Sequence, residues 1–197
     1  ETIAKQHPDQ RLVERSLAVA LNQLGDVERG REPWPAVLAL YNRALAIVER
    51  LIAADPGSAM LLQDLWTTSL KIAEVETITG AYDAALANYR RGLAAIGQLA
   101  TERPDDLALQ TDLALSHSRI GITLNAMKQY DGALTQHRRA LGIRERIAAA
   151  QPHDTSRQRE VAVSLTRVGE VLAALGQRGE AVETFRKAIA IVERLVA

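Results

Sequence analysis

Apolar residues recur along the chain at intervals of three and four, with polar residues between them. Leu17, Leu21 and Leu24 show this spacing, and the stretch 113–124 repeats it. Because an α-helix has about 3.6 residues per turn, residues at these intervals lie on one face of the helix. Nothing in the sequence shows the alternation of apolar and polar residues that a β-strand requires. The pattern therefore predicts an all-α chain.

Prolines divide this helical pattern into windows of equal length. Four of the six prolines are spaced by 48 residues, at Pro8, Pro56, Pro104 and Pro152. Helices end before a proline, because the preceding residue avoids helical backbone angles. Residues that can cap the amides of a new helix follow each of these prolines: Asp9, Ser58, Asp106 and Asp154.

Each window is expected to contain two helices of about 20 residues. Glycines that favour a left-handed turn lie between the two predicted helices, at Gly30, Gly80 and Gly176. In the first window, Pro33 and Pro35 suit the opening turn of the second helix, where a missing N–H costs nothing.

The four windows also match position by position away from the prolines. An apolar residue is followed at once by a small one at Leu24-Gly25, Ile72-Ala73, Ile120-Gly121 and Val168-Gly169. Three further positions align across the windows. The first is mostly alanine, at Val37, Ala85, Ala133 and Ala181, and the second carries a ring, at Tyr41, Tyr89, His137 and Phe185. The third is small, at Ala44, Gly92, Ala140 and Ala188. An ordinary helical bundle needs no such register. We therefore expect stacked units that share a continuous core, with Tyr41, Tyr89 and Phe185 filling the gaps between units.

The period sets the expected boundaries. Repeat 1 covers 8–55, repeat 2 covers 56–103, repeat 3 covers 104–151, and repeat 4 covers 152–197 and is cut before its end. Residues 1–7 align with the end of a second helix, so both ends of the chain are expected to lie inside a unit of a longer protein. Leu195 and Val196 stand where a terminal repeat usually has a polar face, and we expect self-association through the cut ends.

At these columns the sequence resembles the tetratricopeptide repeat. Leu24-Gly25, Ile120-Gly121 and Val168-Gly169 are similar to the Leu-Gly pair of that family, and the aligned alanines and rings are similar to its Ala, aromatic and Ala positions. Asp55-Pro56-Gly57-Ser58 is similar to its Asp-Pro-Gly-Asn connector. The resemblance implies an α-solenoid of antiparallel helix pairs, coiled as a right-handed superhelix, that binds proteins or peptides and is not an enzyme.

Two departures from the family accompany the resemblance. The usual unit has 34 residues, so a 48-residue unit lengthens each helix by about two turns. Similar lengthened units occur in large bacterial signalling proteins, which the resemblance therefore implies as the setting. The family usually has an aromatic residue where this chain has Glu28, Glu76, Leu124 and Leu172, so the first two units have an acidic residue at a packing position of the family.

Composition narrows the possible partners. Lys+Arg and Asp+Glu both number 24, so the formal net charge is zero and nucleic acid is not an expected partner. Basic pairs such as Arg90-Arg91 and Arg138-Arg139 are interpreted as a solvated outer face, because acids on the same helices balance them. No apolar run is long enough for a membrane span and no signal peptide opens the chain, so we expect a cytoplasmic protein that does not bind membranes.

Candidate chemistry is sparse. The chain has no cysteine, no glycine-rich phosphate loop and no pair of histidines at helical metal-ligand spacing. His117 and His137 fall in core columns of one unit, and Asp112 and Ser116 lie near them in sequence, so a catalytic grouping can be written down. Hydrogen-bonded or groove-lining histidines are the favoured interpretation, and no catalytic, metal or cofactor site is predicted.

The family resemblance points instead to the first helix of each unit, which lines the concave groove in tetratricopeptide proteins. The aligned groove positions are Asn22, Asp26, Arg29, Lys71, Glu74, Ser118, Arg119, Ile122, Thr166, Arg167 and Glu170. Lys71–Glu74 and Arg167–Glu170 have the spacing of pairs within one helix. Arg119 has Ile122 in the place of that acid, which makes Arg119 the preferred candidate for holding a ligand carboxylate.

Two functions remain open at this point. The chain is either an interaction scaffold with a peptide or partner domain in its groove, or a regulatory arm of a linked signalling enzyme such as an NTPase, kinase or protease. Both use the same fold.

Overall fold

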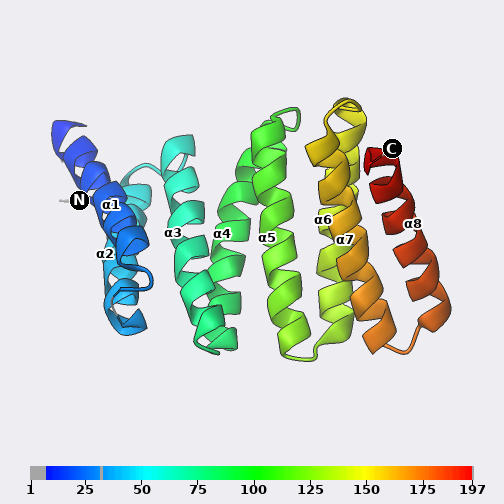
Figure 1. Cartoon of the computed structure of the whole chain (residues 1–197). Coiled ribbons are helices and arrows are strands. Elements are labelled where there is room, and N and C mark those ends of the chain that lie inside the picture. The colour runs from blue at the N-terminus through cyan, green and yellow to red at the C-terminus, as the bar shows by residue number, and fades with distance from the viewer. Residues whose placement is uncertain (1–7, 32, 197) are drawn as a thin grey trace. The chain divides into compact units, whose positions relative to one another are not determined.

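The computed structural model describes residues 8–31 and 33–196, and all elements in these ranges that extend beyond a turn are α-helices. The helices are α1 (Pro8–Glu28), α2 (Trp34–Ala54), α3 (Ala59–Ile78), α4 (Tyr82–Glu102), α5 (Leu107–Ala126), α6 (Tyr130–Ala150), α7 (Thr155–Ala174) and α8 (Arg178–Val196) (Figure 1). Each has 19 to 21 residues, as the sequence pattern predicts. The prediction for residues 1–7 lies outside the described residues.

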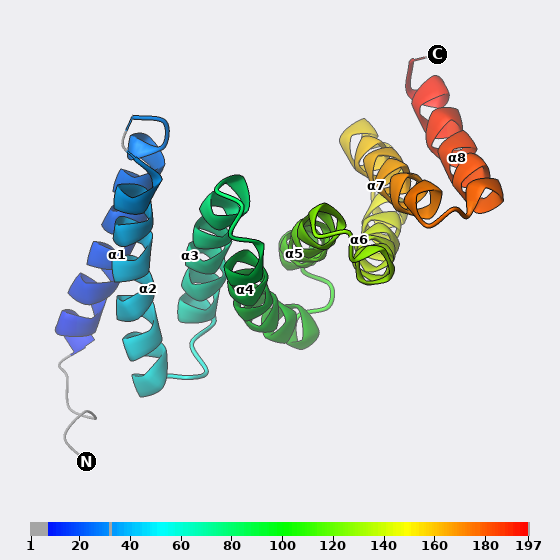
Figure 2. The same cartoon turned by 90° about the horizontal axis from the view of Figure 1, so that it is seen from below.

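The chain forms two compact units, Glu1–Leu99 and Ala100–Ala197. The first holds α1, α2, α3 and most of α4, and the second holds α5 to α8. Within each unit, consecutive helices reverse direction and pack side by side, as α1 and α2 or α7 and α8 do (Figure 2). Each 48-residue window of the sequence contains one such helix pair.

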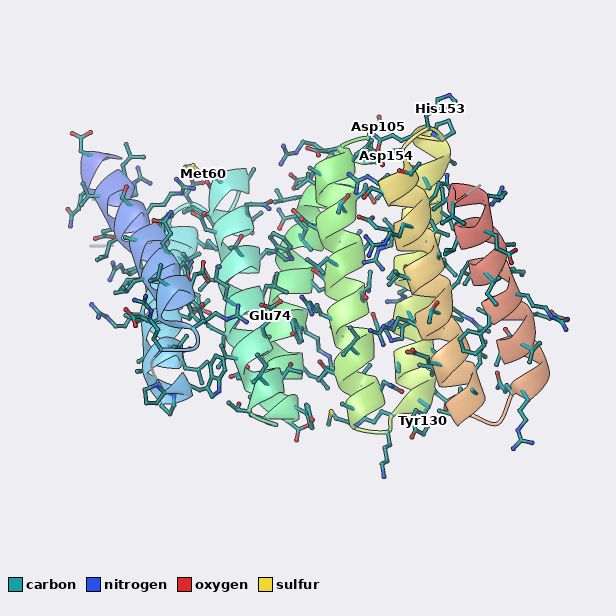
Figure 3. All side chains as sticks on the ribbon, in the orientation of Figure 1. Met60, Glu74, Asp105, Tyr130, His153 and Asp154 are labelled. Atoms are coloured by element: carbon teal, nitrogen blue, oxygen red, sulfur yellow. The ribbon has the colours of Figure 1, made fainter. Side chains whose placement is uncertain are left out.

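Polar side chains begin three of the first helices. The Ser58 hydroxyl accepts a hydrogen bond from the Leu61 amide, and the Asp106 and Asp154 carboxylates each accept from two amides of the first turn. Figure 3 shows Asp154 at the start of α7. Asp9 is different, because it lies inside the first turn of α1 and is not the cap that the sequence suggested. Pro33 caps α2 and Pro35 lies in its opening turn, as predicted.

The turn between the two helices of a pair is the same in three of the four helix pairs. Gly80 and Gly176 have positive φ angles of 80° and 77°, and the amide that follows each glycine returns to a carbonyl of the preceding helix. Lys128 occupies the equivalent position with a φ of 59° and keeps that hydrogen bond, from Gln129 N to Leu124 O at 2.9 Å. The turn is therefore retained where the glycine that favours it is missing.

Inside three of the four pairs, the large ring of the second helix lies on a glycine of the first. A Cβ atom added to Gly121 would lie 2.7 Å from the His137 ring, and one added to Gly169 would lie 2.8 Å from the Phe185 ring. Gly25 is covered in the same way by the buried Tyr41 ring. The rings therefore fill space between the two helices of one pair. Tyr41 also packs with Ile72 and Val75 of the next pair, as the sequence suggested.

The departures from the family pattern are accommodated individually. Leu124 and Leu172 are buried at the position where the family has an aromatic residue. Glu76 is half-buried there, and its carboxylate accepts a hydrogen bond of 2.9 Å from the Asn88 amide. Burial raises the pKa of Glu76, while the hydrogen bond from Asn88 and the charge of Arg91 oppose that rise.

Replacing Gly121 with alanine tests the ring-on-glycine contact. Alanine favours helix over glycine by about 1 kcal/mol, but here its Cβ would overlap the buried His137 ring. Such overpacking costs about 1–3 kcal/mol, so we expect G121A to lower the free energy of unfolding in urea. The matched control is G142A in α6, where an added Cβ meets no atom within 4 Å. It should raise stability by about 0.5–1 kcal/mol, and stabilisation by both variants would contradict the contact.

The His137 side chain should make stability depend on pH. Burial lowers the pKa of His137 to about 4, with Arg167 and Arg144 adding to the effect and Glu170 opposing it. The unfolded chain, with a histidine pKa near 6.5, binds more protons between these values. Stability is therefore complete above about pH 6.5 and is lost as the pH falls toward 4, by up to about 3 kcal/mol.

The control is H137F, which places on Gly121 the ring that Phe185 places on Gly169. Urea unfolding of both proteins at pH 7 and pH 4.5 should show a loss on acidification that is about 2 kcal/mol larger for the wild type. Equal losses would show that His137 does not titrate as its burial implies.

Candidate functional site

Polar side chains connect the first helices of the two pairs in the first unit. Asn22 Nδ2 donates to Thr68 Oγ1 at 2.7 Å, Lys71 Nζ lies 2.6 Å from Asp26 Oδ2, and Arg29 Nη1 lies 3.2 Å from Glu74 Oε2. Figure 3 labels Glu74 on α3. These contacts join α1 to α3 at separations of 45 and 46 residues. Four residues expected to line a groove therefore pair with one another, Lys71 with Asp26 and Arg29 with Glu74, while a fifth, Asn22, binds Thr68.

The structure corrects two expectations about these residues. Asn22 is buried, so it is part of the packing between α1 and α3. Lys71 and Glu74 were expected to pair within α3, but Lys71 pairs with Asp26 on α1 and Glu74 pairs with Arg29, the residue that follows α1. An ion pair between neighbouring helices stabilises their packing, whereas an ion pair within one helix does not connect it to another.

Tyr41 adds the second helix to this network. Its hydroxyl donates to Asp26 Oδ1 at 2.8 Å, and the Lys71 ammonium lies 5.9 Å from the centroid of its ring. Burial raises the pKa of the Tyr41 hydroxyl, and the Asp26 carboxylate raises it further, so the hydroxyl remains a donor. Asp26 thus joins α1, α2 and α3 at one point.

Arg15 and Asp64 form a further bridge that the sequence interpretation missed. Arg15 donates to both carboxylate oxygens of Asp64, at 2.6 and 3.1 Å, across the same two helices. The signal was present, because the two opposite charges are separated by 49 residues in a chain whose period is 48. Three ion pairs therefore connect α1 and the residue after it to α3 in the first unit.

The second unit arranges the same columns differently on α5 and α7. Ser118 is buried and Ile122 is half-buried, and the Thr166 hydroxyl donates to the Ala162 carbonyl of its own helix. The Arg167 and Glu170 side chains are 47% and 44% exposed and form the predicted pair within α7, with Nη1 and Oε2 3.0 Å apart. The second unit therefore has an exposed ion pair on α7 in these columns.

Arg119, the residue that the sequence favoured for holding a ligand carboxylate, is half-buried and interacts with other groups of the protein. Its predicted role in ligand binding stays a prediction. Among the predicted groove residues of the second unit, Arg167 is the exposed cation.

His117 and His137 each contact a different residue of the third helix pair. His117 Nδ1 lies 2.7 Å from Gln136 Oε1, and the His137 ring lies on Gly121. The Ser116 hydroxyl donates to the Asp112 main-chain carbonyl at 2.9 Å. Burial lowers the pKa of His117, with the hydrogen bond to Gln136 opposing the fall. In the described part of the chain, no three His, Asp or Glu side chains are grouped to hold a metal ion.

Apolar surface is concentrated on α1 and α8. Exposed large apolar side chains on α1 are Leu12, Val13, Leu17, Leu24 and Val27, and those on α8 are Val182, Ile189, Val192 and Val196. A cavity of about 440 Å³ lies between α7 and α8, lined mainly by alanine, valine, leucine and isoleucine. None of the helices in the described ranges combines the length and apolarity needed to cross a bilayer.

Comparison with known proteins agrees with this architecture. The tetratricopeptide repeat family model matches residues 113–153 and 161–196, which cover most of the third and fourth helix pairs. No curated protein matches the chain in sequence.

Solved structures share the fold at low sequence identity. The apo form of RapI has a TM-score of 0.71 and 19% identity over 92% of this chain and 44% of its own. MamA has a TM-score of 0.54 and 17% identity over 91% of this chain and 80% of its own. BtubC (BKLC) from P. vanneervenii has a TM-score of 0.51 and 14% identity over 93% and 83%.

This chain spans less than half the length of RapI. The predicted fold class, an all-α solenoid of helix pairs, is confirmed by these neighbours and by the eight helices of the described residues. The family match over 113–153 and 161–196, together with the ring-on-glycine columns and the repeated turns, supports assignment of the chain to the tetratricopeptide-repeat proteins.

Proposed function

We propose that this chain binds a protein or peptide through the face that α5 and α7 present in the second unit, with Arg167 as the anchor for a carboxylate. Tetratricopeptide repeats generally mediate protein–protein interactions and are typically not catalytic, so binding is the class of function to locate. The choice of Arg167 as the anchor depends on one aligned position of the repeat, which is Asp26 in the first unit and Ile122 in the second.

The observation that carries the proposal is the replacement of an acid by Ile122. In the first unit, Lys71 on α3 reaches back to Asp26 on α1. Arg167 on α7 is the equivalent of Lys71, and the equivalent of Asp26 on α5 is Ile122. The cross-helix acid is therefore absent from that position, and Arg167 pairs with the exposed Glu170 of its own helix.

This substitution leaves a cation that can change partners. An exposed pair at i, i+3 contributes only about 0.2–0.5 kcal/mol. A bidentate bond from arginine to a ligand carboxylate is stronger, because two parallel charged hydrogen bonds form in fixed geometry. Ile122, at the position from which Asp26 reaches Lys71 in the first unit, offers an apolar contact to such a ligand. The chemistry fits a segment with an acidic residue, or a terminal carboxylate, next to an apolar side chain.

The first unit supports this site without taking part in it. Its aligned residues are engaged with one another in the contacts between α1 and α3. Ligand contacts at those positions would have to break ion pairs that join two helices. We therefore assign recognition to the second unit, where Arg167 and Glu170 join no elements.

Selection of peptides from a random displayed library on the purified chain tests the proposal. We expect enriched peptides to carry an acidic residue or a free terminal carboxylate beside an apolar one. Binding of a synthetic selected peptide, measured by fluorescence anisotropy, should weaken at least about tenfold in R167E. It should also weaken as salt is raised, because the pair is exposed.

The matched control is R186E, a charge reversal of the same type at an exposed position on α8. It should leave the peptide affinity unchanged, and circular dichroism melting of both variants should confirm that they remain folded. Selected peptides without an acidic group, or equal binding by wild type and R167E, would reject the assignment of Arg167.

A further inference from the structure

The exposed apolar face of α1 uses the columns that later first helices bury. Val27 is 60% exposed and Leu24 is 47% exposed, yet their equivalents on α3, Val75 and Ile72, are almost completely buried. Val75 and Ile72 pack in one cluster with Val37, Tyr41 and Leu45 of α2. The α1 face therefore has the composition of a surface that packs on a second helix.

The outer face of α8 has the complementary property. Ile189 is 55% exposed and Val192 is also exposed, while their equivalents on α2, Leu45 and Val48, are buried. Leu45 and Val48 are covered because α3 packs on them. The α8 face is thus the kind of surface on which a first helix packs.

We propose that these two faces bind each other between copies of the chain, so that α1 of one copy packs on α7 and α8 of another. The contact of α3 with α1 and α2 supplies the template. There, Leu65 of α3 packs against Ala18 and Leu21 of α1 and against Ala44 and Val48 of α2.

The equivalents of this leucine and of the residues that it packs against are exposed on α1 and line a pocket between α7 and α8. The equivalent of Leu65 on α1 is Leu17, which is 48% exposed. The equivalents of Ala18, Ala44 and Val48 are Ala162, Ala188 and Val192, and these three line the cavity of about 440 Å³ between α7 and α8. A leucine side chain of a second copy therefore has a preformed apolar site of suitable size.

Charge at the rim agrees with this register. Within the first unit, Arg91 of α4 lies 3.4 Å from Glu49 of α2, which joins neighbouring second helices. The equivalent residues at the two ends are Arg43 and Glu193, and both are exposed. Packing a second copy in the template register brings these opposite charges to the same place in the interface.

The interface is heterologous, because it joins two different surfaces, and such contacts close into rings or extend as linear chains. That property gives a sharp experiment. Sedimentation velocity of the 197-residue chain from micromolar to near-millimolar concentration should show a mass that rises beyond a dimer. V27E blocks the α1 face and I189E blocks the α8 face, so each variant alone should be monomeric.

Mixing the two variants decides the geometry. V27E keeps an intact α8 face and I189E keeps an intact α1 face, so the mixture should form one-to-one dimers and nothing larger. I78E is the control, because Ile78 is an exposed apolar residue of α3 away from both faces, and its association should equal that of the wild type. E193R should weaken association and the added R43E should restore it.

Several outcomes would overturn the proposal. A wild-type chain that is monomeric at all concentrations would show that a second copy does not occupy these faces. Self-association of V27E or I189E alone would show that a face binds its own kind. A mixture that stays monomeric while the wild type associates would show that the contact uses other residues.

Discussion

The contact of a large ring with a glycine of the facing helix is the constraint on which three of the four helix pairs depend. Gly25, Gly121 and Gly169 lack the Cβ atom that would meet the rings of Tyr41, His137 and Phe185. Glycine inside a helix costs about 1 kcal/mol relative to alanine, and this cost is offset because the ring can lie directly on the helix backbone. Close approach of the two helices fixes their relative rotation. That rotation decides which side chains face the next pair and which remain in solvent.

The structure of each helix pair could largely be predicted from the sequence, because it depends on residues that lie close together along the chain. The helices, their lengths, the turn glycines and the ring and glycine columns follow from periodicity and from backbone chemistry that acts within one 48-residue window. Lys128 shows a limit, since its left-handed turn is imposed by the hydrogen bonds of the pair and carries no glycine to announce it. Asp9 shows another, because a capping residue type does not cap when the helix already includes it.

The polar network could not be read with the same certainty, because one sequence pattern fits two structures. Lys71 and Glu74 have the spacing of a pair within one helix, yet Lys71 binds Asp26 on α1 and Glu74 binds Arg29, just after α1. Arg167 and Glu170 have the same spacing and do pair within α7. The deciding residue lies a full period away, where Asp26 offers a carboxylate and Ile122 does not. Candidate sites in repeat proteins therefore have to be compared by column across units, since neighbours in sequence do not settle the pairing.

The two proposed contacts differ in their physical origin, and this keeps them separable. Recognition at Arg167 relies on an exposed guanidinium, so its affinity depends on ionic strength. Association of the α1 and α8 faces removes apolar side chains such as Leu17, Val27 and Ile189 from water, so it should carry a negative heat-capacity change and respond weakly to salt. Both arise from one repeated pattern. Where α1 and α8 keep apolar residues whose equivalents in other pairs are buried, apolar surface is exposed, and where Ile122 replaces an acid, we expect Arg167 to be available to a partner.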